Sequence, residues 1–327
     1  MTLRIGTRGS ALALAQCGDV AELITERTGI KTELVPVTTH GDVSQASLSS
    51  LGGTGVFASA LREALRSGMC DIVVHSMKDL PTAPYPGLVV AAVPEREDAR
   101  DALCARDGLT LDGLPEGARV GTGSPRRVAQ ILARRPDLDV VDIRGNVDTR
   151  LRFVSSGELD AVVLAVAGLT RLGRTEAITE VFALDAWPTA PAQGALAVET
   201  LETLDPTGDD EVARAVRAIN DADAFVAAHA ERSVLAGLEA GCSAPVGASA
   251  LVGDGTLRLT ASVYANDGSS AVSDDAVTMF SNPIDTSDPT DFDGPGPDAR
   301  IAVAGRIGFD LAASLLSAGA PGLADRP

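Results

Sequence analysis

The sequence predicts an α/β protein with a smaller C-terminal α+β domain. Two observations carry this prediction. Short β-rich apolar runs alternate with amphipathic helical stretches over the first two thirds of the chain, which is typical of α/β sheets. After about residue 220 the pattern changes to one long Ala-rich helix followed by three candidate strands.

The first set of elements begins directly at the N-terminus. Ser10 is a suitable N-cap because its hydroxyl can accept from the free N–H groups of a first helical turn, and Gly29 supplies a stop. We therefore expect a helix from Ser10. A second helix is predicted over 57–68, and strands are predicted at 3–7, 32–38, 71–76 and 88–94.

A second set of the same kind starts near residue 100. Ser124 followed by Pro125 has the chemistry of an N-cap and a first helical position. Helices are predicted over 124–136 and 147–157, and strands at 102–106, 118–122, 139–144, 161–169 and 195–200.

The third part has a different composition. A helix is predicted over 221–241, with strands at 248–254, 256–265 and 271–280. Residues 281–298 combine Pro, Gly and Asp without apolar periodicity, so we expect an acidic, solvated loop there. The last predicted helix carries one apolar stripe, formed by Val303, Ile307, Leu311 and Leu315.

The charge composition excludes several classes of partner. The chain has 45 acidic and 27 basic residues and a formal charge of −18, and only Lys31 and Lys78 are lysines. We interpret this as adaptation to a salt-rich cytoplasm, with four scattered cysteines kept as thiols. The acidic balance argues against nucleic-acid partners, and no stretch approaches about 18 consecutive apolar residues, so we expect a soluble protein without a membrane span.

Several common site motifs are missing from the sequence. The three histidines lie far apart in the sequence, so no metal site is predicted. The Gly-rich segments at 52–55 and 121–124 complete neither a Walker loop nor a dinucleotide fingerprint.

Arginines concentrate in three short windows, at 121–127, 144–152 and 169–174. Gly, Ser and Asn lie beside them, which suits an anionic small ligand held by guanidinium groups and backbone N–H groups. One such window alone would more often be a solvated helix face. Three close together favour anion binding, and a helix starting at Ser124 would direct its free N–H groups at the ligand of Arg126 and Arg127.

Two further residues could carry chemistry. Asp79 follows a hydrophobic strand, and strand carboxyl ends in α/β sheets face the ligand crevice. A carboxylate there can bind an N–H donor, stabilise a developing cation and move a proton, although Lys78 and Asp79 could also form a surface turn. Cys242 lies among Gly, Ser and Pro and could be a nucleophile or an attachment point, although a free Cys is more often a small buried apolar residue.

Several segments in this order resemble the porphobilinogen deaminase family, also called the hydroxymethylbilane synthases. The segments are RIGTRGSALALAQ, VHSMKDLPT, EREDARDAL, GTGSPRRVAQ, RRPDL, RGNVDTRL, DAVVLAVAGLTRLG, AQGALAVE and LEAGCSAPVG, which together span residues 3 to about 250. The combination of HSMKDLP, RGNVDTRL and the Gly-Cys loop is highly specific.

The resemblance implies two lobes like those of periplasmic binding proteins, each with a mixed doubly wound sheet, and a third α+β domain. The implied domains are 1–95 with 196–218, then 100–191, then 219–327. The implied activity is the stepwise condensation of four porphobilinogen molecules, with loss of ammonia, on a dipyrromethane attached to Cys242 as a thioether. The protein would then be a cytoplasmic transferase of tetrapyrrole (haem) biosynthesis, and by family expectation a monomer.

The resemblance also assigns roles to residues at matching positions. Asp79 is the implied catalytic carboxylate, which would bind pyrrole N–H groups and offset the positive charge left when ammonia departs. The implied cofactor-binding residues are Cys242, Lys78, Ser124, Arg126, Arg127, Arg144, Arg150 and Gly194. The implied substrate-binding residues are Arg8, Ser10, Arg144, Arg150, Arg171 and Gln193.

Three positions depart from the family pattern. Thr54 stands where relatives commonly have Lys, so one carboxylate contact could be lost there. Gly123 replaces a frequent Ser, and Ala192 replaces a Gly before Gln193.

Two other classes of function are alternatives to this interpretation. A non-catalytic organic-anion-binding protein would also have arginine-lined lobes, but it leaves Cys242 and the third domain unused. A transferase acting through a transient Cys242 adduct would show labelling that substrate removes.

Overall fold

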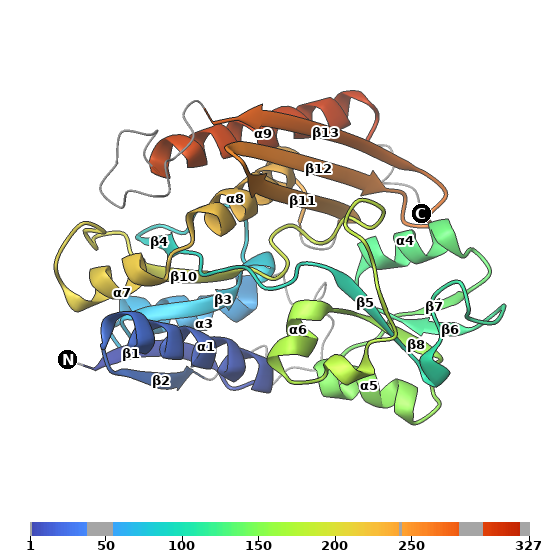
Figure 1. The fold of residues 1–327 in the computed structure, drawn as a ribbon, viewed down its shortest axis with the longest axis horizontal. Coiled ribbons are helices and arrows are strands. Elements are labelled where there is room, and N and C mark those ends of the chain that lie inside the picture. The colour runs from blue at the N-terminus through green and yellow to red at the C-terminus, as the bar shows by residue number, and fades with distance from the viewer. Residues whose placement is uncertain (1, 38–54, 242–243, 281–296, 321–327) are drawn as a thin grey trace. The chain divides into compact units, whose positions relative to one another are not determined.

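The computed structural model describes residues 2–37, 55–241, 244–280 and 297–320. Contacts divide the chain into two compact units, Met1–Glu97 with Ala195–Phe225, and Asp98–Gly194 with Val226–Pro327. Three sheets are present in the described residues, one in the first unit and two in the second (Figure 1).

The sheet of the first unit has the strand order β2-β1-β3-β10-β4. Three strands run parallel, because β1 pairs in parallel with both β2 and β3. The strand β10 lies antiparallel between β3 and β4, so the sheet is mixed. The strands are β1 (Leu3–Arg8), β2 (Thr32–Val37), β3 (Ile72–Ser76), β4 (Leu88–Ala92) and β10 (Leu196–Leu201).

Helices cover this sheet through two separate apolar cores. Side chains of α1 (Ala11–Thr28) and α7 (Glu211–Ile219) share one core with β1, β3 and β10. Side chains of α3 (Gly55–Arg66) form the other with Val73 and Leu88. The predicted ends of α1 are confirmed: the Ser10 hydroxyl accepts from the Ala13 N–H at 3.3 Å, and Gly29 ends the helix at φ 72°.

The first sheet of the second unit repeats this order with other strands, as β7-β6-β8-β5-β9. Here β6 pairs in parallel with β7 and β8, while β5 lies antiparallel between β8 and β9. The strands are β5 (Asp101–Ala105), β6 (Arg119–Gly121), β7 (Asp139–Val141), β8 (Ala161–Ala165) and β9 (Glu180–Val181), and the helices are α4 (Pro125–Arg134), α5 (Val147–Ser155) and α6 (Val166–Arg171).

The second unit also holds an antiparallel meander. Its strands are β11 (Val246–Gly253), β12 (Thr256–Tyr264) and β13 (Ala271–Met279), paired in that order. One face packs on α8 (Ala222–Gly237) and α9 (Pro297–Ser317), and Figure 1 shows α9 lying along β13. The predicted stripe of α9 is confirmed, since Ile307, Leu311 and Leu315 are buried in this core and Val303 packs against it.

Some sequence predictions about the elements were wrong. The run 161–169 was expected to be one strand, but β8 ends at Ala165 and α6 begins at Val166. Both halves are buried, and burial on all sides does not distinguish a strand from a helix. The helix α7 was not predicted, although Asp210 caps it by accepting from the Ala213 N–H at 2.9 Å. The acidic loop 281–298 lies outside the described residues except at Pro297 and Asp298, where α9 begins.

Two mid-helix glycines should respond oppositely to a methyl group. A Cβ on Gly308 of α9 would lie 2.6 Å from the Ala230 carbonyl oxygen of α8, whereas a Cβ on Gly18 of α1 would have no neighbour within 4 Å. We expect Gly308→Ala to destabilise the protein by about 1–3 kcal/mol through overpacking, and Gly18→Ala to stabilise it by about 0.5–1 kcal/mol. Thermal unfolding of both variants measures this, and a raised midpoint for Gly308→Ala would contradict the close helix contact.

Candidate active site

In the first unit, the predicted site residues gather where two parallel strands end. Arg8 is the last residue of β1, and Ser10 caps the helix that follows. The strand β3 leads into a 3-10 helix, Met77–Asp79, which carries Lys78 and Asp79. Because β1 and β3 are parallel neighbours, these residues lie at one edge of the sheet. Asp79 is exposed and Lys78 is half-buried.

Gln16 connects α1 to the end of β3 at this edge. Its side-chain amide donates to the Ser76 hydroxyl at 2.8 Å, and the same hydroxyl lies 3.2 Å from the Gln16 carbonyl oxygen. Gln16 is buried on α1, and Ser76 directly precedes the 3-10 helix. These contacts therefore fix the start of the turn that carries Asp79 relative to α1.

A buried charge cluster lies beside the same strand. Glu199 of β10 receives two hydrogen bonds from Arg62, at 2.9 and 2.6 Å, and its Oε2 lies 3.1 Å from His75 Nε2. Burial alone would raise the pKa of Glu199, but the contacts with His75 and Arg62 outweigh it and lower the pKa from 4.5 to about 2. The carboxylate thus stays ionised inside the unit.

In the second unit, three parallel strand ends carry most of the predicted arginines. The segment from Ser124 to Arg127 follows β6, Arg144 follows β7, and Arg171 ends the helix after β8. Ser124 and Pro125 begin α4 as predicted, although no hydrogen bond to the Ser124 side chain caps the helix. Arg144 is exposed and pairs with Asp142 at 3.5 Å.

Arg126 and Arg127 are held by one buried carboxylate that the sequence analysis did not single out. Asp101, with no exposed surface, accepts from Arg126 Nη2 at 2.9 Å and from Arg127 Nη2 at 2.6 Å. Trp187 Nε1 and Gln193 Nε2 also donate to it, at 3.0 and 2.7 Å. Four N–H donors match the acceptor capacity of one carboxylate.

The charge balance of this cluster is incomplete. Burial would raise the pKa of Asp101, but the attraction of Arg126 and Arg127 outweighs it and holds that pKa far below its usual range. The three side chains therefore sum to one positive charge. Within the described part of the chain, the Nε atoms of Arg126 and Arg127 are buried without a hydrogen-bond partner.

The segment before β10 brings further predicted residues to the same unit. Gln193 is buried, and its amide also donates to the Ala99 carbonyl at 2.8 Å. Arg171 donates to the Gly194 carbonyl at 3.0 Å, while Arg150 donates to the Gly145 carbonyl at 2.8 Å. Gly194 has a φ of 88°, which favours glycine.

Ala192 also has a left-handed φ, of 62°. Its N–H donates to the buried carboxylate of Glu231 at 2.5 Å, and the other oxygen of Glu231 accepts from the Ala250 N–H at 2.7 Å. This anchor holds the residue that precedes Gln193.

Gly123 fits its surroundings only without a side chain. A Cβ there would lie 2.7 Å from the Ile143 carbonyl oxygen. The loop after β6 therefore packs so closely against Ile143 that a side chain at position 123 would require a shift of backbone.

Two residues selected from the sequence have no described structure. Cys242 and Thr54 lie outside the described residues. Among the residues that are described, no group of His, Cys, Asp and Glu could hold a metal ion, and no helix is long and apolar enough to cross a membrane.

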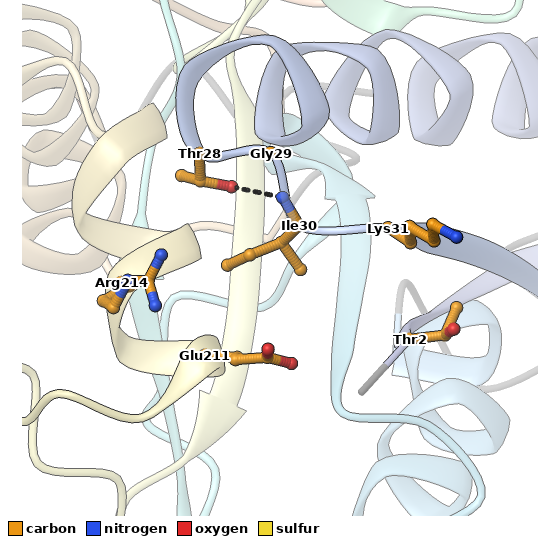
Figure 2. Close-up of a pocket in the computed structure, with 7 residues that line it drawn as sticks. All are labelled: Thr2, Thr28, Gly29, Ile30, Lys31, Glu211 and Arg214. Carbon is orange, nitrogen blue, oxygen red and sulfur yellow. Dashed lines mark hydrogen bonds between the residues drawn. The ribbon is translucent and has the colours of Figure 1, made fainter.

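A surface pocket in the first unit contains none of the predicted site residues. Figure 2 shows it at the start of β1, the opposite end of that strand from Arg8. Its lining residues are Thr2, Thr28, Gly29, Ile30, Lys31, Glu211 and Arg214.

Sequence reasoning overlooked Asp101, Gln16 and Trp187. Asp101 stands in the EREDARDAL segment, and Trp187 is the chain's single tryptophan, so both offered a weak signal. A carboxylate that opens a strand of buried residues needs charged partners inside the fold.

The fold and these strand ends define an α/β protein whose arginine-rich edge suits a ligand with several carboxylates. Residues 3–209 match the family model described as the porphobilinogen deaminase dipyrromethane cofactor binding domain, and residues 225–288 match the porphobilinogen deaminase C-terminal domain. The chain therefore belongs to the porphobilinogen deaminase family. Membership gives it the transferase activity that yields hydroxymethylbilane, and the dipyrromethane cofactor.

Individual relatives agree with the family match. A porphobilinogen deaminase of Leifsonia xyli is 65% identical over 266 residues, covering 81% of this chain and 80% of the relative. One of Thermobifida fusca is 53% identical over 319 residues, covering 97% and 94%. Among solved structures, the methionine binding protein MetQ matches with a TM-score of 0.43 and 13% identity, covering 67% of this chain and 89% of that one.

The buried Glu199 cluster predicts a specific acid response. Because the folded-state pKa, about 2, lies below the ordinary 4.5, the charge of Glu199 stabilises the fold fully above pH 4.5 and progressively less as the pH falls toward 2. We expect Glu199→Gln to be destabilised most at neutral pH and to approach the wild type in acid. Urea unfolding across this range measures the difference, with the exposed Glu26→Gln as control. A difference that does not change with pH would contradict the assignment.

Proposed function

We propose that Asp79 is the catalytic carboxylate and that the arginines at the strand ends bind the carboxylates of the cofactor and of porphobilinogen. The observation that carries the anion-binding part is the buried pair Arg126 and Arg127, whose guanidinium groups both pair with the single carboxylate of Asp101. A buried pair with one excess positive charge favours an anionic ligand, since an uncompensated charge inside a protein is costly.

The residues present fit a dipyrromethane that carries acidic side chains. Arg126 and Arg127 have buried Nε donors without partners in the described structure, and a carboxylate can accept from such donors. Lys78, Ser124, Arg144, Arg150 and Gly194 would complete the cofactor-binding set, with Cys242 as the attachment point. When bound, the cofactor supplies the pyrrole carbon that receives each new substrate unit.

Asp79 acts on the reacting ring in this proposal. Its exposed carboxylate, at the end of β3, is available to accept from pyrrole N–H groups. Loss of ammonia from the substrate leaves positive charge on the ring, and a fixed carboxylate beside it lowers the barrier. The Gln16 contact with Ser76 holds the turn in place, so little reorganisation is needed.

The remaining predicted residues divide between two roles. Arg8, Ser10, Arg144, Arg150 and Arg171 would bind substrate carboxylates. The Gln193 side chain donates hydrogen bonds to Asp101 and to the Ala99 carbonyl. It would therefore position the arginine cluster as well as bind substrate.

We also propose a cytoplasmic monomer that binds neither nucleic acid nor membranes. The three cysteines in the described residues, Cys17, Cys70 and Cys104, are buried free thiols, and burial raises the pKa of each. Unpaired thiols suit a reducing compartment.

Removing the charge of Asp79 should nearly stop turnover. We expect Asp79→Asn to lower kcat by at least about 100-fold, because the developing positive charge loses its counter-charge. Asp107→Asn is the control, since Asp107 is also an exposed aspartate, in the short segment Arg106–Gly108. Steady-state kinetics with porphobilinogen measures both. Near-normal turnover of Asp79→Asn would exclude the proposed role.

Covalent attachment can be tested by intact mass. The purified wild type should exceed its sequence mass by one dipyrromethane, and Cys242→Ala should lose that increment because no thiol remains to form the thioether. Cys17→Ala, which removes a buried thiol, should retain it. An organic-anion-binding protein would show no increment in any variant, and an increment kept by Cys242→Ala would move the attachment elsewhere.

A further inference from the structure

Tyr264 contacts two parts of the second unit, the helix α4 and the segment at Pro245. It is the last residue of β12 and is only 8% exposed. Its backbone N–H donates to the Pro245 carbonyl at 3.0 Å, three residues after Cys242. Its hydroxyl receives a hydrogen bond from Gln130 Nε2 on α4, at 3.1 Å.

The orientation of Gln130 is fixed by its other partners. Its carbonyl oxygen accepts from Arg126 Nη1 at 2.6 Å, and its amide nitrogen donates to the Pro188 carbonyl at 2.9 Å. Arginine can only donate and a carbonyl can only accept, so the amide cannot be reversed. The Tyr264 oxygen must therefore be the acceptor, and its contact steadies the amide that holds Arg126.

Arg126 shares its acceptor, Asp101, with Trp187, the only tryptophan in the sequence. Arg126 Nη2 and Trp187 Nε1 both donate to Oδ2 of Asp101, at 2.9 and 3.0 Å. Arg126 is 2% exposed and Gln130 is 5% exposed, so water competes little for these bonds. A displacement of Arg126 would change the hydrogen bond of the Trp187 indole.

We propose that Tyr264 is a positioning residue, which holds the Arg126 guanidinium through Gln130 and links its placement to the segment following Cys242. This rests on the proposed function, in which Arg126 binds a cofactor carboxylate. A guanidinium that is already fixed loses less conformational freedom on binding, so pre-arrangement favours uptake of the cofactor.

The test compares the two tyrosines of the chain. Tyr264→Phe removes the hydroxyl and keeps the ring. Tyr85→Phe is the matched control, because the Tyr85 ring lies 4.6 Å from the Arg62 guanidinium in the first unit. One readout is the single indole ¹H–¹⁵N resonance of Trp187. The other is the rate at which the full-length apoprotein gains the dipyrromethane mass from porphobilinogen.

We expect Tyr264→Phe to shift the indole resonance and to slow cofactor loading about fivefold, the equivalent of one hydrogen bond. Tyr85→Phe should leave both unchanged. Gln130→Met breaks the same link from its other end, so it should shift the resonance too, and its effect should not add to that of Tyr264→Phe.

The Arg126→Lys variant distinguishes a failure of the Tyr264 role from a failure of the proposed Arg126 contact. If Arg126→Lys loads cofactor slowly while Tyr264→Phe and Gln130→Met match Tyr85→Phe in both readouts, Tyr264 has no positioning role. If Arg126→Lys loads at the wild-type rate, the proposed cofactor contact of Arg126 fails, and with it the role of Tyr264 in loading.

Discussion

The buried carboxylate of Asp101 organises the arginine-rich edge of the second unit. It opens β5, the strand that lies antiparallel between β8 and β9, and it receives donors from α4 and from the segment 187–193. Without it, two guanidinium groups would be buried with no counter-charge, at a cost of several kcal/mol. With it, one positive charge remains, held in a fixed position inside the unit.

Both units have a mixed sheet with three neighbouring parallel strands. Each mixed sheet places a set of parallel strands side by side, so residues that are distant in sequence meet at the strand ends. In the first unit this brings together Arg8 and the turn with Asp79. In the second it brings together Ser124, Arg144 and the helix with Arg171. Strand ends offer repeated positions for cationic groups, and the proposed ligand, which carries several carboxylates, requires many of them.

Buried charge is used differently in the two units. Glu199 accepts two hydrogen bonds from Arg62, and His75 Nε2 lies 3.1 Å from it, so the charges of Glu199 and Arg62 balance within the unit. Asp101 pairs with two arginines at once, and among the described residues the Nε atoms of Arg126 and Arg127 have no hydrogen-bond partner. The first arrangement stabilises the sheet beside β3. The second suits a binding role, because its remaining donors are strengthened by the low dielectric around them.

The sequence by itself determined many of the local elements, and the family. Ser10, Gly29 and the Ser124-Pro125 pair mark helix ends because capping depends on a few adjacent residues, and β1, β3 and α4 lie where periodicity predicts them. The sequence also selected Arg126 and Arg127 as ligand-binding candidates. Only the tertiary structure showed that they share Asp101, which is 25 residues from Arg126, and that Trp187, 86 residues from Asp101, donates to the same carboxylate. Strand order and burial decide such pairings, and neither is encoded in the local spacing of residues.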